Sequence, residues 1–208
     1  MRHLVREKKP FICCIQETKL SVFDSAVCKY LWGDECVDFS FQPALGASGG
    51  IVSMWDTNEV EVWSSISFNH VLAILGRFVK SGELFAVFNV YAPCDSSRQQ
   101  DLWNNLSNRL VSLSDQNFCI CGDFNAVRRE EERRSVGNNF CQVRSVNYNL
   151  FIEDNLLIDL PLRGRNFPWF RGDGRSMSRI DRFLLSDRWC QTWPNCFQMA
   201  MPRGLSDH

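Results

Sequence analysis

Four short motifs rich in carboxylate, amide and imidazole groups occur in one order along this sequence of 208 residues. They are Gln16-Glu17-Thr18-Lys19, Gly122-Asp123-Phe124-Asn125, Ile180-Asp181-Arg182 and Ser206-Asp207-His208, with Tyr91-Ala92-Pro93 between the first and second. Three of the motifs follow or lie at the end of an apolar run, so folding would gather their carboxylates at one rim of a sheet. Carboxylates in that position can hold a divalent metal beside a phosphate ester. The combination predicts a metal-dependent phosphodiesterase.

The first motif contains a candidate metal ligand. Glu17 follows the apolar run from Phe11 to Ile15, so rigid backbone would hold its carboxylate at the rim. A hard cation such as Mg²⁺, or Mn²⁺ in its place, takes one or two carboxylate oxygens and keeps water for the rest of its shell. The alternative is an ordinary surface glutamate at the end of a strand.

The second motif contains a candidate catalytic pair. Asp123 and Asn125 are two residues apart, and in an extended stretch they would face one pocket while Phe124 turns into the core. The acid can take a proton from water, and the amide can donate to an oxygen of a developing phosphorane. Tyr91 ends another expected strand, and its phenol can donate to phosphate. The alternatives are an Asx turn at Asp123 and a packing role for Tyr91.

The last two motifs contain a candidate histidine and its partner. Protonated His208 can pair with a phosphate oxygen, and a carboxylate such as Asp181 can hold its tautomer and raise its basicity. Asp207 and His208 can serve one site only if the backbone turns there, which Gly204 would allow. The alternative is a terminal histidine without a role.

Several other classes of protein are disfavoured. The sequence has no Gly-x-Ser-x-Gly nucleophile motif and no Walker-type phosphate loop. Its 10 cysteines include no Cys-x-x-Cys pair and no signal peptide precedes them, so reduced structural thiols are expected rather than zinc ligands or disulfides. The apolar stretches are too short to cross a membrane. We therefore expect a soluble, intracellular protein.

The charge distribution points to an anionic partner. The formal net charge is only -1, yet the segment 163–188 contains seven arginines and three aspartates. A local surplus of positive charge of this kind is typical of a surface that binds a polyanion.

The hydrophobic pattern predicts an α/β fold in one domain. Strands are expected at 11–15, 60–63, 71–79, 84–91, 117–121 and 178–185. Helices are expected before Pro10, from Ser21 to Leu31, from Asp95 to about Leu113 and from Arg144 to Asn155. The run from Arg128 to Arg134 is expected to be a solvated charged loop with no further role. The arrangement predicts two mixed, mainly antiparallel sheets packed face to face with helices outside.

Together these motifs resemble the endonuclease/exonuclease/phosphatase superfamily of DNase I-like enzymes. The segments 11–20, 122–125, 156–165 and 169–189 are similar to the endonuclease domain of plant LINE-type non-LTR retrotransposons. The resemblance covers residues 1–208 and implies a four-layered α/β sandwich. It also implies a Mg²⁺-dependent DNA endonuclease whose cut leaves a 3′-hydroxyl to prime reverse transcription. A reverse transcriptase fused in the intact element and a nuclear location would fit this function.

The resemblance also implies a role for each matching residue. Asp123 would orient and activate the attacking water, and Asn125 would stabilise the pentacovalent transition state. Tyr91 would contact the phosphate, and Asp181 would orient His208.

Two further groups of residues are implied to bind ligands. Glu17 would ligate the metal, and Asp207 would complete the environment of the metal or of the histidine. The DNA phosphates would be contacted by four arginines, which are Arg171, Arg175, Arg179 and Arg182.

The chain departs from the superfamily at both ends. Its members begin with a strand that carries an asparagine motif, and they continue past Ser-Asp-His into a closing strand. Neither strand occurs in this sequence, so a sandwich truncated at both ends with unpaired strand edges is expected. A catalytically inactive retroelement remnant and a phosphomonoesterase of the same fold are the alternative functions.

Overall fold

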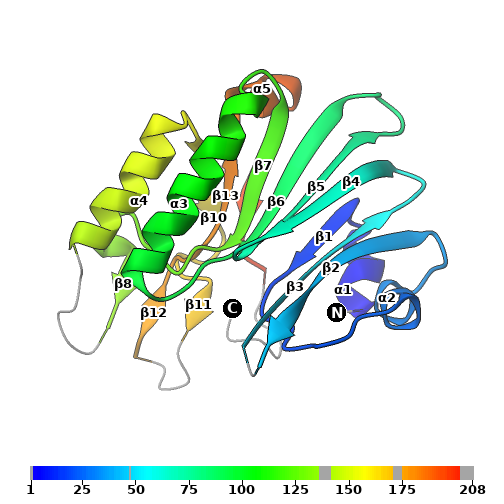
Figure 1. Ribbon diagram of the computed structural model, residues 1–208, viewed down its shortest axis with the longest axis horizontal. Helices are drawn as coiled ribbons and strands as arrows, with labels where there is room; N and C mark the ends of the chain where they lie inside the picture. The colour runs from blue at the N-terminus through cyan, green and yellow to red at the C-terminus, as the bar shows by residue number, and fades with distance from the viewer. Residues whose placement is uncertain (1, 47, 136–141, 171–174, 202–208) are drawn as a thin grey trace.

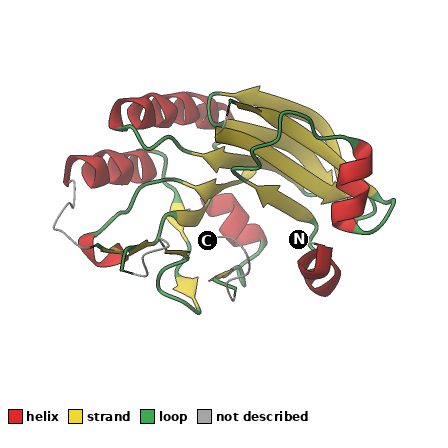
Figure 2. Ribbon diagram, turned by 90° about the horizontal axis from the view of Figure 1, so that it is seen from below, coloured by secondary structure: helices red, strands yellow, loops and turns green. Residues whose placement is uncertain are grey.

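The computed structural model describes residues 2–46, 48–135, 142–170 and 175–201. Two β-sheets pack face to face in it, with helices on both outer faces (Figure 1). In Figure 2 the strands of the two sheets run side by side, and two long helices lie along the outside. This is the four-layered α/β sandwich that the sequence predicts.

The larger sheet has six strands in the order β4-β5-β6-β7-β13-β9. They are β4 (Val60–Phe68), β5 (Val71–Phe78), β6 (Leu84–Tyr91), β7 (Asn117–Asp123), β13 (Asp181–Leu185) and β9 (Ile158–Asp159). Neighbouring strands are antiparallel except for β6 and β7, which run parallel. The predicted meander is therefore confirmed as β4, β5 and β6.

The smaller sheet has the order β1-β3-β2. Its strands are β1 (Ile12–Ile15), β2 (Val37–Leu45) and β3 (Ser48–Asp56). Among the described residues, β1 pairs only with β3, so its other edge has no partner strand. An apolar cleft of about 630 Å³ opens between the sheets next to this edge, and Phe11 and Phe183 line it.

Five α-helices and two short 3₁₀ helices are described. They are α1 (Arg2–Lys8), α2 (Ser25–Trp32), α3 (Ser96–Leu110), α4 (Gln142–Asp154), α5 (Asp187–Thr192), η1 (Val111–Leu113) and η2 (Glu130–Glu132). None of the described helices is both long and apolar enough to cross a bilayer. The pair α3 and α4 covers the outer face of the larger sheet, and the pair α1 and α2 covers that of the smaller sheet (Figure 1).

Three apolar layers hold the sandwich together. Trp103, Phe124 and Tyr148 pack between the larger sheet and its helices, where burial of apolar surface supplies most of the stabilisation. Trp55 and Val87 belong to the layer between the two sheets. A third layer lies under α1 and α2.

Helix α2 begins later than the sequence suggests. Its N-cap is Asp24, whose carboxylate accepts the backbone N–H of Val27 at 2.9 Å, so the expected cap at Ser21 is wrong. The predicted end is confirmed, because Gly33 lies in the left-handed region at φ 90° and its N–H bonds to the Lys29 carbonyl.

The expected strand 178–185 is divided into two. β12 (Met177–Ser178) pairs with β11 (Trp169–Phe170) and β8 (Arg133–Arg134) in a small separate sheet, and β13 begins at Asp181. A second small sheet joins β10 (Leu162–Arg163) to β14 (Gln198–Met199). The break lies at Arg179 and Ile180, where the Arg179 N–H donates to the Glu132 carbonyl and the Ile180 carbonyl accepts from Phe124.

Candidate active site

Three of the predicted site residues lie side by side on neighbouring strands. In the parallel pairing of β6 with β7, Tyr91 is the partner of Asp123, and in the antiparallel pairing of β7 with β13, Asp123 is the partner of Asp181. Directly opposite residues point to the same face of a sheet. That face carries Cys121 and meets the smaller sheet, so the three polar groups stand where the two sheets open at one rim.

Glu17 reaches this rim from the smaller sheet. It follows β1 with a φ of 52°, a left-handed conformation that is uncommon for a residue with a side chain. The next two residues fix the turn, because Thr18 and Lys19 donate their backbone N–H groups to the carbonyls of Gly50 and Gly49 at 3.1 and 3.0 Å. Lys19 also pairs with the Glu17 carboxylate at 3.4 Å.

Charged groups from both sheets act on the Tyr91 phenol. Burial raises the pKa of the Tyr91 phenol well above its usual value, and the negative charges of Glu17 and Asp123 raise it further. Cys94 is in the same environment, and its pKa is raised by burial and by the charge of Asp123. Both groups therefore stay protonated near neutral pH, and Tyr91 is a hydrogen-bond donor beside two carboxylates.

The Asp123–Asn125 segment is a turn rather than an extended stretch. Asn125 has a φ of 47°, and its backbone N–H donates to the Asp123 carboxylate at 2.7 Å, which is an Asx turn. The extended geometry expected here is wrong, although Phe124 does turn into the core, where it is fully buried. Asn125 instead donates its side-chain N–H to the Ala92 carbonyl at 2.8 Å.

A buried glutamine of the helix layer hydrogen-bonds to this turn. Gln99 of α3 donates its amide to the Asn125 carbonyl at 3.0 Å and is 3% exposed. Asp123 is itself only 4% exposed. The carboxylate is therefore held by its own turn and by a helix behind the sheet.

The described side chains fit a hard divalent cation. Glu17 and Asp123 offer carboxylate oxygens at one rim, and Mg²⁺ needs only one or two of these because it keeps several waters. Among the described residues there is no group of three or more His, Cys, Asp or Glu arranged as a metal site. Two carboxylates suit a cation that keeps part of its water shell.

Three predicted site residues fall outside the part of the chain that the structure describes. They are Arg171, Asp207 and His208. The fourth motif is accordingly not placed relative to the other three.

The surface role expected for Arg179 and Arg182 is wrong in this structure. The Arg182 side chain is 0% exposed and pairs with Glu132 and with Asp159. Arg179 is 15% exposed and pairs with the same two carboxylates. A guanidinium enclosed in this way has no access to DNA phosphate, whereas Arg175 is exposed.

The run from Arg128 to Arg134 is more than a solvated loop. Arg128 and Glu132 enter the same group of charges, through bonds to Asp159 and Arg182 that lie 31 and 50 positions away. No local pattern reveals partners at such separations. One signal was present, since Arg182 occupies a position in β13 that faces the core, and a core arginine requires carboxylate partners.

A buried polar contact beneath the site was also missed. Gln16 donates its amide to Asn89 Oδ1 at 2.5 Å, and Asn89 donates to the Val52 carbonyl at 2.9 Å and to Ser53 Oγ at 3.2 Å. These bonds join the two sheets directly under Glu17. Asn89 lies in an apolar strand with no neighbouring polar motif, so its partners could be found only in three dimensions.

A four-layered α/β sandwich with carboxylates gathered where its two sheets open is the architecture of the DNase I-like class. The sequence profile of the Endonuclease/Exonuclease/phosphatase family matches residues 1–208, and the chain belongs to this family.

Solved structures share the fold at low sequence identity. An AP endonuclease from Leishmania major aligns with a TM-score of 0.70 and 15% identity, over 90% of this chain and 73% of that one. The endonuclease domain of TRAS1, a telomere-specific non-LTR retrotransposon, aligns with a TM-score of 0.63 and 16% identity, over 88% and 76%. A mannosyl-6-phosphatase from Bacteroides thetaiotaomicron aligns with a TM-score of 0.61 and 14% identity, over 89% and 74%. No curated protein matches the sequence significantly.

Proposed function

We propose that this chain is a Mg²⁺-dependent DNA endonuclease domain of a retroelement. The observation that carries the proposal is the strand pairing that places Tyr91, Asp123 and Asp181 side by side on three adjacent strands. The charge of Glu17 also raises the pKa of the Tyr91 phenol. Fold neighbours that are AP endonucleases and a retrotransposon endonuclease support a DNA substrate. The resemblance to plant LINE elements supports a nicking step that precedes reverse transcription, with a reverse transcriptase in the same element and a nuclear location.

In this proposal each residue has one task during hydrolysis. Asp123 accepts a proton from the attacking water, whose oxygen forms a bond to phosphorus. The bond from phosphorus to O3′ breaks and the leaving O3′ takes up a proton from solvent water, so one side of the nick carries a 3′-hydroxyl and the other a 5′-phosphate. Tyr91 donates its phenol to a phosphate oxygen, and Asn125 supplies an amide donor beside it. Asp181 orients His208, which pairs with the phosphate.

The metal would be held by Glu17, with Asp207 completing its surroundings. A bound Mg²⁺ or Mn²⁺ supplies positive charge that stabilises the negative charge developing on phosphate. Lys19 contacts Glu17 at 3.4 Å, so the carboxylate already lies next to a cation in this conformation.

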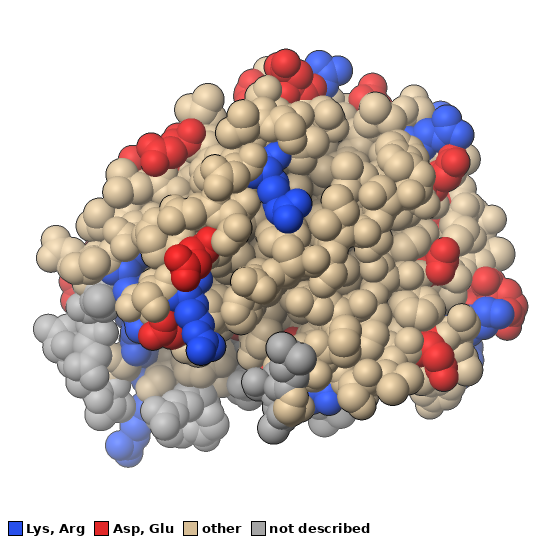
Figure 3. All heavy atoms as spheres, in the orientation of Figure 1, with Lys and Arg blue, Asp and Glu red and all other residues tan. Residues whose placement is uncertain are grey.

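DNA contacts in this proposal are made by exposed arginines near the rim rather than by Arg179 and Arg182. Arg133 and Arg134 of β8 are exposed, as are Arg163 and Arg175. On the face shown in Figure 3, basic and acidic side chains are interspersed at the lower left, where β8 and β12 lie in Figure 1. Contacts of this kind give affinity without base recognition, so binding should weaken steeply as salt rises.

A plasmid-nicking assay with Mg²⁺ tests the activity. The unmodified chain should convert supercoiled DNA to the nicked form, and Asp123→Ala should reduce the rate by at least about a hundredfold because the water loses its base. Asp101→Ala is a matched control, since Asp101 is exposed on α3, which covers the opposite face of the larger sheet. Equal nicking by the unmodified chain and by Asp123→Ala would refute the assignment of the site.

A second candidate, an inactive remnant, is favoured by the open edge of β1. Among the described residues β1 pairs only with β3, and the apolar cleft lined by Phe11 and Phe183 lies beside its other edge, so the sandwich is open there. Comparing this chain with one extended at both ends in the same assay separates the candidates. Nicking by the extended protein alone would support the remnant.

A third candidate keeps the fold and changes the substrate to a phosphomonoester. The fold shared with a mannosyl-6-phosphatase is the observation in its favour. Release of inorganic phosphate from a sugar or inositol phosphate, without nicking of DNA, would support it.

A further inference from the structure

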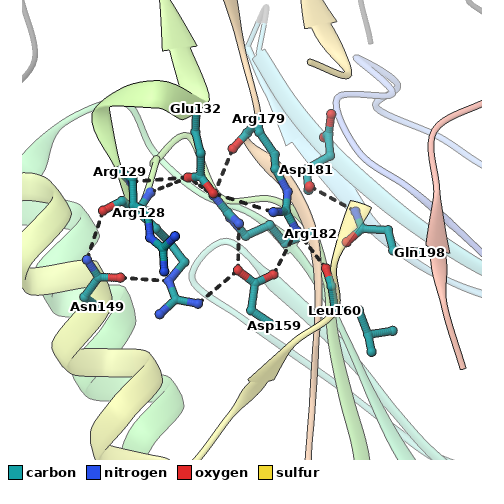
Figure 4. Close-up of polar contacts among 10 residues, drawn as sticks. All are labelled: Arg128, Arg129, Glu132, Asn149, Asp159, Leu160, Arg179, Asp181, Arg182 and Gln198. Carbon is teal, nitrogen blue, oxygen red and sulfur yellow. Dashed lines mark hydrogen bonds and ion pairs between the residues drawn. The ribbon is translucent and has the colours of Figure 1, made fainter. Parts of the chain in front are cut away.

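Five charged side chains form a buried cluster behind the strand that carries Asp181 (Figure 4). We call it the buried charge cluster, and its members are Arg128, Glu132, Asp159, Arg179 and Arg182. They come from the loop after β7, from η2, from β9 and from the segment that enters β13. Three guanidinium groups share two carboxylates, so each guanidinium has a carboxylate partner and one positive charge is in excess.

Arg182 is the centre of the cluster. Its side chain is fully buried, and it donates one N–H to Asp159 at 2.8 Å and another to the carboxylate of Glu132. Burial lowers the pKa of Arg182, but the nearby negative groups outweigh this and leave its pKa raised. The guanidinium also lies 5.9 Å from the centre of the Tyr148 ring, so α4 covers it.

The Glu132 carboxylate is held ionised by its partners. Burial opposes the ionisation of Glu132, yet the positive charges of Arg182 and Arg179 keep its pKa below the usual value. The Glu132 carboxylate also accepts the backbone N–H of Arg128 at 2.7 Å. Arg128 in turn binds Asp159 at 3.1 Å and Asn149 of α4 at 2.8 Å, which ties the cluster to the helix layer.

Hydrogen bonds of the cluster hold the short segment Arg179–Arg182 in place. Arg179 donates its backbone N–H to the Glu132 carbonyl at 2.9 Å, and its own carbonyl accepts from Arg182 Nη2 at 3.2 Å. Arg179 Nη2 binds Asp159 at 3.1 Å. These bonds fix the two residues that flank Ile180 and Asp181.

The other side of the same segment is fixed by the sheet. Phe124 donates its backbone N–H to the Ile180 carbonyl at 2.9 Å, and Gln198 donates its amide to the Asp181 carbonyl at 3.2 Å. Asp181 is thereby held as the partner of Asp123 across β7 and β13. A shift of two residues in this pairing would keep the same faces but move the carboxylate along the rim.

We propose that the buried charge cluster is a positioning device for Asp181. Glu132 and Asp159 act through Arg179 and Arg182, and they set the place at which the Asp181 carboxylate meets Asp123. This inference rests on the proposed function, because it assigns Asp181 a part in the reaction. Adjacent residues on a strand point to opposite faces, so Arg182 faces α4 while Asp181 faces the rim. The cluster therefore touches no substrate.

A double-variant comparison tests the proposal in the nicking assay. Asp159→Asn should lower kcat by about tenfold or more and leave KM for plasmid DNA within about twofold, as expected for loss of a residue that orients another. The double variant Asp159→Asn/Asp181→Asn should be no slower than Asp181→Asn alone, because the cluster acts only through Asp181. Glu61→Gln is the control, since the Glu61–Arg77 pair is an exposed ion pair on β4 and β5.

Other outcomes would overturn the proposal. If the losses from Asp159→Asn and Asp181→Asn multiply, the cluster acts elsewhere in the protein. If Asp159→Asn does not fold, Glu132→Gln is tested in its place. This variant keeps the Glu132 backbone carbonyl, which accepts the backbone N–H of Arg179. If neither variant folds, the cluster holds the fold as a whole rather than one residue, and the proposal fails. An unchanged rate in Asp181→Asn would instead count against the role of Asp181 in the proposed function.

Discussion

Gly122 shows how closely the backbone passes beneath the candidate site. It lies in β7 next to Asp123, and its φ of 131° belongs to a region that residues with side chains rarely adopt. A Cβ atom placed there would lie 2.1 Å from the Val90 carbonyl oxygen and 3.1 Å from Gln16 Nε2. The glycine therefore allows β7 to approach both β6 and the residue that precedes Glu17.

Gly122→Ala should destabilise the protein strongly. Backbone strain and the clash with Val90 together should lower the free energy of unfolding by about 3 kcal/mol. Gly82→Ala is the matched control, because Gly82 also has a positive φ of 73° but open space around its Cβ position. The control should cost about 1 kcal/mol. Urea unfolding measures both, and equal losses would show that the close approach to Val90 is unimportant.

Glu132 makes the stability depend on pH in a defined direction. Its folded-state pKa lies below the reference value of 4.5, so its contribution is present above about pH 4.5 and is lost as the pH falls through the folded-state pKa. Glu132→Gln should cost about 3 kcal/mol at pH 7, because Arg182 loses a buried partner. Urea unfolding of both proteins between pH 7 and pH 3.5 should show this difference shrinking below pH 4.5. A constant difference would refute the ion pair.

At the scale of elements, caps decide where α2 begins. The expected cap Ser21 and the observed cap Asp24 are both suitable residue types, so sequence preference cannot separate them. The choice depends on where the chain leaves the smaller sheet, since Leu20 is still bonded through its carbonyl to the backbone N–H of Ala44. Ser21 is therefore too close to the sheet to start the helix.

Substitution of each candidate N-cap, Ser21 or Asp24, tests this assignment. Asp24→Ala should lower the free energy of unfolding by about 1 kcal/mol, because the backbone N–H of Val27 loses its acceptor. Ser21→Ala should change it by less than about 0.5 kcal/mol, as for an ordinary surface position. Thermal unfolding of the two variants measures the difference. The reverse order would show that the helix begins at Ser21.

At the scale of the whole molecule, the two sheets are joined by a polar contact as well as by apolar packing. Asn89 is fully buried in the larger sheet and bonds to Gln16, Val52 and Ser53 of the smaller sheet. A buried polar group is stable only when its hydrogen-bond partners are within reach, so it specifies how the sheets face each other.

Asn89→Ala should weaken both the fold and the site. Loss of the amide leaves Gln16 and the Val52 carbonyl without their partner, which should cost about 2 kcal/mol of unfolding free energy. Asn58→Ala, in the exposed turn between β3 and β4, is the control and should cost less than about 0.5 kcal/mol. In the nicking assay Asn89→Ala should require more Mg²⁺, because Gln16 precedes Glu17. An unchanged Mg²⁺ requirement would show that Glu17 is held by other contacts.

The meander and the polar residues near the strand ends were predicted from the sequence. Apolar runs and tight turns are local signals, and they located the meander, β7 and α3 together with Asp123 at the end of β7. The resemblance to the superfamily then grouped these motifs into one site, whereas the pairing of β7 with β6 and β13 is known only from the structure. The residues Tyr91, Asp123 and Asp181 could accordingly be grouped before any coordinates were known.

What the tertiary structure decided is which charged groups remain exposed. Arg179 and Arg182 lie in an arginine-rich segment that was expected to bind DNA, but folding places them against Glu132 and Asp159 inside the protein. Pairing between residues 20 to 50 positions apart leaves no periodic trace in the sequence. Local preference therefore fixes the elements and their polar ends, whereas burial, which depends on the packing of distant segments, determines which charges are available to a ligand.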